Sequence, residues 1–172
     1  MERKKYTLIL LIFSFSLLSL TAQNKSAIYN AYIHNQMDKW KTVIDKMQLE
    51  TNPSDEFLLE LINYQYGYIA WCIGNNEKKQ AKAYLKLAED NLAELEKRSY
   101  NSSYINAYKS AFYGFNVGLN KLKAPFLGPK SVNAAKLSMQ EDASNPYGFI
   151  QFGNAQFYMP PIFGGSKSEA LK

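Results

Sequence analysis

The segment from Glu77 to Arg98 carries apolar side chains at helical spacing, and this periodicity constrains the fold more than any other feature of the chain. The apolar residues fall at offsets of 0, 3, 4, 7, 11 and 14, in the order Ala81, Tyr84, Leu85, Ala88, Leu92 and Leu95. This spacing places them on one stripe of an α-helix. Lysines and acidic residues fill most of the other positions, so the sequence predicts an outer helix with one face in water.

The preceding segment, Ser54 to Ile73, has two apolar stripes. One consists of Phe57, Leu61, Tyr64, Tyr68 and Trp71, and the other of Leu58, Ile62, Tyr66, Ile69 and Ile73. A helix that is apolar on two sides packs on two sides. We expect Asn52 as its N-cap with Pro53 at the first helical position, and Gly74-Asn75-Asn76 as the turn into the next helix. The two segments therefore predict a helical hairpin.

Caps and helix breakers extend this pattern along the chain. Helix starts are expected near residues 25, 38, 53, 76, 102, 131, 146 and 166. Asn101 or Ser102 caps an aromatic helix that continues to about Leu122. Breakers and caps then delimit the later helices: Pro125, Gly128 and Pro129 as breakers, Ser131 as a cap, Asn145-Pro146 as a start, Pro160-Pro161 as an end and Ser166 to Glu169 as a capping box. The predicted fold class is all-α.

The first 22 residues have the pattern of a cleavable signal peptide. Arg3, Lys4 and Lys5 precede an uncharged run of 14 residues from Thr7 to Leu20, and small residues follow it up to Ala22. The run is shorter than the roughly 18 residues that span a bilayer, so we expect cleavage near Ala22 rather than anchoring. No cysteine lies near this point to accept a lipid. The expected location of the mature chain is the periplasm or the medium.

The expected mature chain, residues 23–172, has enough length for one helical domain but little net charge. It holds 17 basic and 14 acidic residues, a balance of +3, with lysine and glutamate interleaved. This pattern is typical of solvated helix faces and does not favour nucleic acid as a partner. Cys72 is the only cysteine, so the chain forms no internal disulfide, and its apolar neighbours predict a buried thiol.

Helix pairs in series, with small residues where helices approach, resemble the tetratricopeptide-repeat (TPR) family of exported Gram-negative proteins. Ala81, Leu85 and Ala88 match the small, large, small spacing of that repeat, and Pro146 matches its closing proline. The intervals from Pro53 to Asn101 and Asn145 exceed the 34 residues of the repeat. The resemblance implies a right-handed superhelix of antiparallel helix pairs over residues 23–172. Because little chain follows the last cap, this region is expected to end in a stub or to be a fragment.

The segment from Gly153 to Ser166 is similar to a sequence motif of such proteins, in which a helix ends in Pro-x-Phe-Gly-Gly before the next helix begins. A phosphate-binding loop is the alternative, but the Gly-Lys-Ser/Thr ending of that motif is absent. We therefore expect a structural turn formed by Pro160, Pro161, Phe163, Gly164 and Gly165.

No set of residues has the spacing of a catalytic or metal site. His34 is the only histidine and is expected at the surface. Carboxylate pairs such as Glu141-Asp142 lie on charged faces, where ordinary pKa values are expected. The sequence therefore predicts a protein that is not an enzyme and that needs no metal or cofactor.

Aromatic residues are the richest chemical feature, with 22 among the 150 residues of the expected mature chain. Tyr104, Tyr108, Phe112 and Phe115 fall at offsets of 0, 4, 8 and 11 and so form one helical stripe. Core packing is one interpretation of this stripe. The other is a binding surface for a peptide or small ligand, with Tyr104, near the helix start, as the better contact and Tyr108 as a core residue.

These features predict a non-catalytic binding or scaffolding module that presents an aromatic concave surface to a protein partner in the cell envelope. The alternative is an accessory subunit of an envelope solute transporter that binds a small ligand. A closed pocket lined by Tyr104 and Tyr108 would favour the alternative, whereas an open groove would favour the protein partner.

Overall fold

A computed structural model describes residues 23–161 and 165–171 of the chain. Every regular element in these ranges is a helix, which confirms the predicted all-α class. The chain divides into two compact units, Met1–Pro53 and Ser54–Lys172. Residues 1–22, which hold the expected signal peptide, lie outside the described part.

The first unit contains a helix over residues 23–33 and α2 (Met37–Met47). Asn35 reverses the chain between them with a φ of 51°. The rings of Tyr32 and Trp40 meet edge to face across this turn, with centroids 6.0 Å apart. His34 is exposed, as expected.

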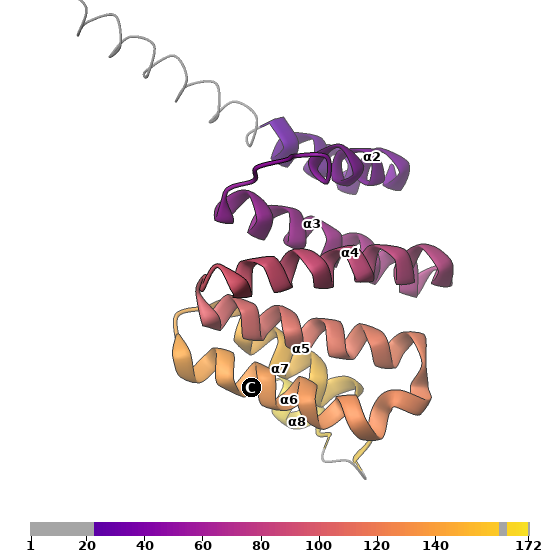
Figure 1. The fold of residues 1–172 in the computed structure, drawn as a ribbon. Coiled ribbons are helices and arrows are strands. Elements are labelled where there is room, and N and C mark those ends of the chain that lie inside the picture. Colours follow the sequence, from indigo (N-terminus) through magenta and orange to yellow (C-terminus); the bar gives the residue numbers. More distant parts are fainter. Residues whose placement is uncertain (1–22, 162–164, 172) are drawn as a thin grey trace, which may run out of the picture. The chain divides into compact units, whose positions relative to one another are not determined.

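The second unit contains the remaining helices (Figure 1). They are α3 (Asp55–Gly74), α4 (Lys78–Lys97), α5 (Ser102–Leu119), the 3₁₀ turn η1 (Lys121–Lys123), α6 (Ala124–Glu141), α7 (Pro146–Tyr158) and α8 (Lys167–Ala170). All the predicted starts in this unit agree with the structure to within two residues except the one at residue 131.

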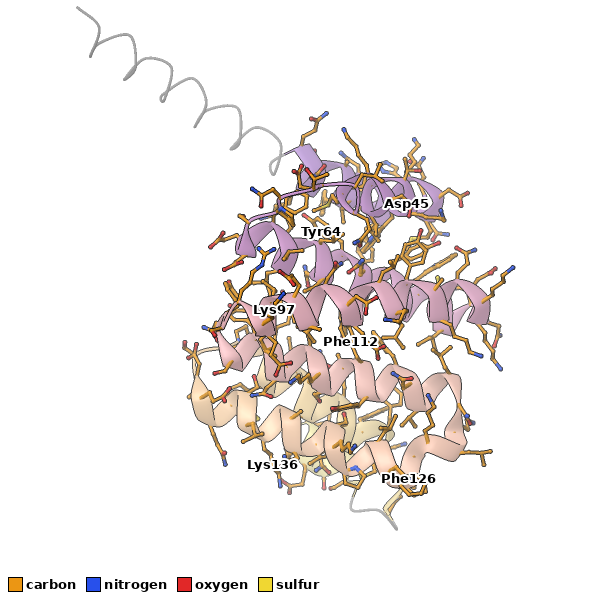
Figure 2. The ribbon with its side chains drawn as sticks, viewed as in Figure 1. Asp45, Tyr64, Lys97, Phe112, Phe126 and Lys136 are labelled. Atoms are coloured by element: carbon orange, nitrogen blue, oxygen red, sulfur yellow. The ribbon has the colours of Figure 1, made fainter. Side chains whose placement is uncertain are left out.

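Helices of the second unit pack in a regular order. α3 contacts α5 and α5 contacts α7, while α4 lies against α3 and α5, and α6 against α5 and α7. The turn between α3 and α4 and the turn between α5 and α6 therefore lie at one end of the unit (Figure 1). Figure 2 shows the same polarity, with Lys97 at the end of α4 and Phe126 near the start of α6 on opposite sides.

The α3–α4 hairpin forms where the two predicted apolar segments meet. All six residues of the predicted α4 stripe are buried, which confirms the outer-helix assignment. The side-chain amide of Asn91 on α4 donates to Gln65 on α3 at 3.1 Å, and both residues are buried. Because an unpaired buried amide is unfavourable, this pair favours one register of the hairpin.

The start of α3 differs from the prediction. Ser54, not Asn52, is the N-cap, and its hydroxyl accepts a hydrogen bond from the Phe57 amide at 3.2 Å. Pro53 therefore precedes the helix instead of occupying its first position. Asn52 and Ser54 are both good N-cap residues. The prediction chose Asn52 because Pro53 would then stand at the first helical position, which proline prefers, and this choice was wrong.

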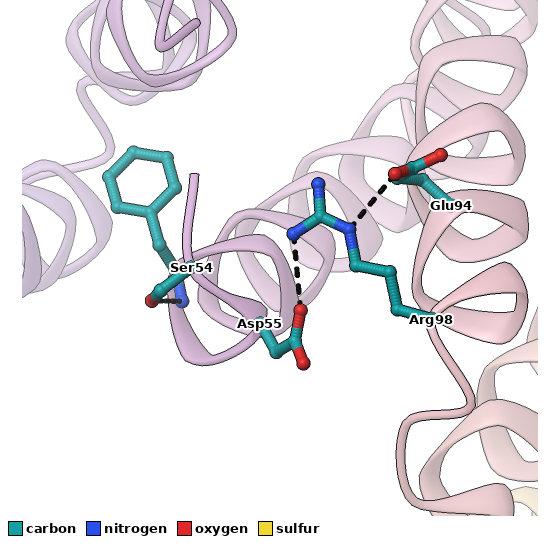
Figure 3. A network of polar contacts seen from close by, with 5 residues as sticks. Ser54, Asp55, Glu94 and Arg98 are labelled. Atoms are coloured by element: carbon teal, nitrogen blue, oxygen red, sulfur yellow. Dashed lines mark hydrogen bonds and ion pairs between the residues drawn. The ribbon is translucent and has the colours of Figure 1, made fainter. Parts of the chain in front are cut away.

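Arg98, just after α4, closes the open end of the hairpin (Figure 3). Its guanidinium donates to Asp55 at 3.1 Å and to Glu94 at 2.9 Å. The hydrogen bond to Glu94 raises the pKa of Arg98 and lowers the pKa of Glu94. Glu94 and Arg98 therefore both remain charged at neutral pH.

The start of α6 is the second difference from the prediction. Pro125 and Pro129 do not break the chain; Pro125 lies in the first turn of α6 and Pro129 lies inside the helix. Pro125 is tolerated because first-turn N–H groups have no partner within the helix. The N–H that Pro129 lacks would have bonded only back into that first turn.

Ser131 is consequently not a cap. It is buried inside α6, and its hydroxyl donates to the Ser110 carbonyl on α5 at 2.8 Å. Ser103 on α5 makes the same kind of bond to the Ser138 carbonyl at 2.8 Å. Small side chains at these positions let α5 and α6 approach closely and satisfy their own hydroxyls.

α7 begins as predicted, with Asn145 accepting a hydrogen bond from the Tyr147 amide at 3.0 Å and Pro146 at the first position. It ends at Tyr158, before Pro160 and Pro161. At Gly165 a Cβ atom would lie 1.9 Å from the Met159 carbonyl oxygen, so this turn requires glycine. Phe163 and Gly164 lie outside the described residues.

After this turn, Ser166 caps α8 by accepting from the Glu169 amide at 3.2 Å, as the predicted capping box requires.

Candidate functional site: an aromatic cluster on three helices

The predicted stripe on α5 divides into buried and half-buried residues. Tyr108 and Phe112 are each only 2% exposed. Tyr104 and Phe115 are half-buried and keep part of their rings at the surface. The two inner rings therefore serve the core, and the two outer rings remain accessible to a ligand.

Two further rings join the stripe from neighbouring helices. Tyr66 of α3 stacks on Phe115 at 5.3 Å and meets Tyr108 edge to face at 6.2 Å. Tyr147 of α7 lies 5.9 Å from Tyr104 and 5.7 Å from Tyr108. These six residues form what we call the aromatic cluster: Tyr66, Tyr104, Tyr108, Phe112, Phe115 and Tyr147.

Sequence reasoning missed the contributions of Tyr66 and Tyr147. Tyr66 was assigned to a stripe of α3, but helical spacing does not tell which neighbouring helix that stripe faces. Tyr147 stands one residue after a helix-starting proline, where no periodic pattern is yet established.

Asn63 on α3 joins the hydroxyls of the cluster. Its side-chain oxygen accepts from Tyr108 at 3.1 Å and from Tyr147 at 3.3 Å. The Gln151 amide of α7 donates to the Tyr66 hydroxyl at 3.4 Å. Side chains of three helices are thereby connected. Asn63 is half-buried and its amide nitrogen makes no bond to the described residues, so that nitrogen can donate to a ligand.

Burial keeps the Tyr108 hydroxyl at the centre of the cluster neutral. Burial, and next the nearby Tyr147, raise the pKa of the Tyr108 hydroxyl well above its ordinary value of 10.0. Tyr108 is therefore a neutral hydrogen-bond donor, not a base. No member of the aromatic cluster carries a charge, and neither do Asn63 and Gln151.

A cleft of about 690 Å³ lies elsewhere in the second unit, where α5 begins and α6 ends. Its lining includes three carboxylates, Glu96, Glu141 and Asp142, and the ring of Tyr100. Glu96 is paired with Lys109 at 2.5 Å, and Glu141 accepts from Asn106 at 2.9 Å. Sequence reasoning missed this cleft, because its walls come from two loops and from the ends of three helices, α4, α5 and α6.

Asp142 is a carboxylate of the cleft whose pKa departs from its ordinary value. Hydrogen bonds from Ser144 lower the pKa of Asp142. The ordinary pKa expected for this carboxyl is thus wrong, but the shift keeps Asp142 ionised and unable to act as a proton donor near neutral pH.

Within the described residues, no group of three or more His, Cys, Asp or Glu side chains is placed to hold a metal ion. Cys72 is fully buried, as predicted, and burial raises the pKa of its thiol. A buried, protonated thiol is a poor nucleophile and a poor metal ligand.

No family model, curated protein or solved structure matches this chain. Among the helices of the described part, none has the length and apolar character needed to cross a membrane.

Proposed function

We propose that the chain is an exported, non-catalytic binding module of the TPR-like kind, a right-handed superhelix of antiparallel helix pairs. In this proposal α3, α5 and α7 line the concave face, and the aromatic cluster on them holds a segment of another envelope protein. The repeated order of helix contacts in the second unit, together with the expected signal peptide, supports this arrangement.

The observation that carries the proposal is that some rings of the cluster are buried whereas others are half-buried. Tyr108 and Phe112 are buried and fix the positions of the three helices. Tyr104, Phe115 and Tyr147 are half-buried and offer apolar area beside hydroxyl groups. Aromatic residues with this mixed character are enriched at protein interfaces, where each ring immobilises few rotatable bonds.

The chemistry of the cluster also indicates what kind of segment it would hold. Its side chains and those of Asn63 and Gln151 are uncharged, so a charged segment would lose hydration without gaining a counter-charge. The Asn63 amide nitrogen can donate to a carbonyl of the partner. We therefore propose an uncharged, partly apolar peptide segment as the ligand.

The test is affinity purification of the processed chain from its own envelope, with mass spectrometry of the recovered proteins, for three forms of the chain. The parent should recover a specific protein, and Tyr104→Ala should lower its recovery at least tenfold. Tyr158→Ala is the matched control, because Tyr158 is a tyrosine of α7 outside the cluster and is 79% exposed. Equal recovery with Tyr104→Ala and with the parent would contradict the proposal.

The transporter alternative has one specific support, the cleft of about 690 Å³, whose size suits a small molecule. This cleft is not lined by Tyr104 or Tyr108, and its carboxylates would select a cation. Native mass spectrometry of the purified chain tests it: a co-purified small molecule that is lost with Glu141→Gln, without any protein partner, would favour the alternative.

A further inference from the structure

The two ends of the second unit carry opposite charge. One end holds the turns between α3 and α4 and between α5 and α6 (Figure 1). We call residues 75–82 and 120–130 the basic end. Its only carboxylate is Glu77, and its lysines are Lys78, Lys79, Lys82, Lys121, Lys123 and Lys130.

The opposite end is acidic. Its carboxylates are Asp55, Glu56, Glu94, Glu96, Glu141 and Asp142. Among the basic residues there, Arg98 is held by Asp55 and Glu94 (Figure 3), Lys109 pairs with Glu96, and Lys97 is the third. A small net charge of the whole chain therefore conceals a strong separation of charge along this unit.

Lysines of the basic end are free to meet an outside anion. All six are exposed, and none pairs with a carboxylate of the described residues. Lys123 donates to the neutral side chain of Asn116 at 3.0 Å. Their positive charge is thus not neutralised within the described part of the chain.

Helix stability does not account for the lysines that stand at helix starts. Lys78 and Lys79 occupy the first turn of α4, which holds no acidic residue, and Lys123 stands at the N-cap of α6. The positive end of the helix dipole disfavours basic residues at a helix start. The sequence therefore keeps positive charge where local structure would favour acidic residues.

Two large apolar side chains stand among these lysines. Leu122, between Lys121 and Lys123, is 84% exposed, and Phe126 is 74% exposed. Figure 2 shows Phe126 on the outer side of α6 near its start. Exposed apolar side chains beside unneutralised lysines combine the two attractions that bind proteins to anionic bilayers.

We propose that the basic end docks on an anionic phospholipid surface, with its lysines at the headgroup phosphates and Leu122 and Phe126 in the boundary between headgroups and acyl chains. A bilayer offers negative charge and an apolar layer within a few ångströms of each other, which neither a nucleic acid nor an acidic protein surface provides as regularly. The acidic end would be repelled and would face away, so the charge separation also orients the unit.

The experiment places a polarity-sensitive fluorophore on the full-length chain at Gly128→Cys, a position in the basic end where a side chain meets open space. Ala143→Cys, in the exposed loop of the acidic end, is the matched control. Cys72 is fully buried and stays unlabelled. The probe reports contact of the basic end itself, whatever residues 1–22 do.

With vesicles of phosphatidylglycerol and phosphatidylethanolamine, emission at position 128 should shift to the blue and emission at position 143 should not. The shift should disappear in 1 M salt, where the Debye length is about 3 Å. Vesicles of phosphatidylcholine alone should produce no shift at position 128. Equal shifts at both positions, or with both kinds of vesicle, would overturn the proposal.

Two variants with the same net charge distinguish binding by the basic end from binding driven by the net charge of the whole chain. In the first variant, three lysines of the basic end are changed together to Gln: Lys121, Lys123 and Lys130. Each lysine contributes about fivefold to the binding constant for anionic vesicles, so this variant should bind them more weakly by a factor on the order of 100. The control variant loses the same charge outside the basic end, and its binding constant should change little. In it, Lys39, Lys46 and Lys97 are changed together to Gln. Equal losses would mean that net charge alone drives binding.

The double variant Leu122→Ser and Phe126→Ser tests the apolar part. It keeps every lysine, so it should retain salt-sensitive association but lose the blue shift at position 128. An unchanged blue shift would contradict insertion of Leu122 and Phe126 into the bilayer. Tighter binding of the parent to heparin or nucleic acid than to anionic vesicles would contradict a lipid surface as the ligand of the basic end. Both side chains are exposed, so thermal melts should match the parent.

Discussion

Tyr104 and Tyr108 lie one turn apart on α5, and their different burial gives them different expected roles. Tyr108 is almost fully buried and donates to Asn63 at 3.1 Å. Tyr104 is half-buried near the helix start and contacts Tyr147. The helical spacing predicted that both residues share a stripe, and the structure adds how deep each of them lies.

Tyr108→Ala should therefore be mainly a stability defect of about 3–5 kcal/mol, by analogy with truncation of buried aromatic residues. Tyr108→Phe keeps the ring and should cost about 1 kcal/mol, because only the hydrogen bond to Asn63 is lost. Tyr104→Ala should cost about 1–2 kcal/mol, since less area leaves the core. Thermal and urea unfolding of the three variants beside the parent measures this, and a Tyr108→Ala protein as stable as the parent would contradict the core role.

The raised pKa of Tyr108 predicts a loss of stability in alkali. The unfolded chain loses this proton near pH 10, whereas burial keeps the folded hydroxyl protonated to higher pH. Stability from this group is thus complete below pH 10 and falls as pH rises above it, by up to about 1.4 kcal/mol for each pH unit. Tyr64 acts in the same direction, because burial and Glu60 raise its pKa.

Urea unfolding between pH 8 and pH 11 measures this effect. Tyr108→Phe should flatten the decline above pH 10, because phenylalanine does not ionise. An equal slope in the parent and in Tyr108→Phe would show that other groups cause the decline.

At the scale of helices, local chemistry was a good guide where one signal acted alone. The stripe of α4, the Asn145 cap of α7 and the Ser166 cap of α8 all agree with the structure. Prediction failed at α6, where Pro125 in the first turn and Pro129 inside the helix were both interpreted as helix breakers. Which interpretation holds depends on the packing of Ser131 against Ser110, a contact between residues 21 positions apart that local sequence does not reveal.

The contact between α6 and α7 depends on Gly148. A Cβ atom at this position would lie 2.7 Å from the Ser138 hydroxyl and 3.2 Å from the Met139 backbone nitrogen. Gly148→Ala should therefore push α7 from α6 and destabilise the chain by about 1–3 kcal/mol.

Gly114→Ala is the matched control for this substitution, because a Cβ atom there meets nothing within 4 Å on α5. It should stabilise the chain by about 0.4–1 kcal/mol. Differential scanning calorimetry of both variants decides the matter: two changes of the same sign would mean that the α6–α7 approach is looser than described.

On the scale of the whole molecule, what the sequence could not supply is the set of contacts between helices. The aromatic cluster joins Tyr66 and Tyr147 across 81 positions of the chain, and no local pattern pairs them. The charge separation of the second unit likewise emerges only when antiparallel helices bring distant turns to one end. Composition reports an average over both ends and so conceals it.

Export is a prediction for the whole chain. The basic residues at positions 3–5, the run from Thr7 to Leu20 and Ala22 should direct cleavage, because this arrangement matches a signal peptide. Intact-mass measurement of the chain in the envelope should show a protein that begins at Gln23. A full-length chain held in the inner membrane would instead identify the segment as an anchor.

The buried thiol of Cys72 makes it possible to measure how often the surrounding core opens. The thiol has no exposed surface on α3, so a soluble alkylating reagent can reach it only after the surrounding helices separate. In excess reagent the alkylation rate then reports how often this part of the core opens, without an added label. Each substitution proposed above that adds no cysteine can be ranked in this way inside intact cells, where calorimetry cannot follow it.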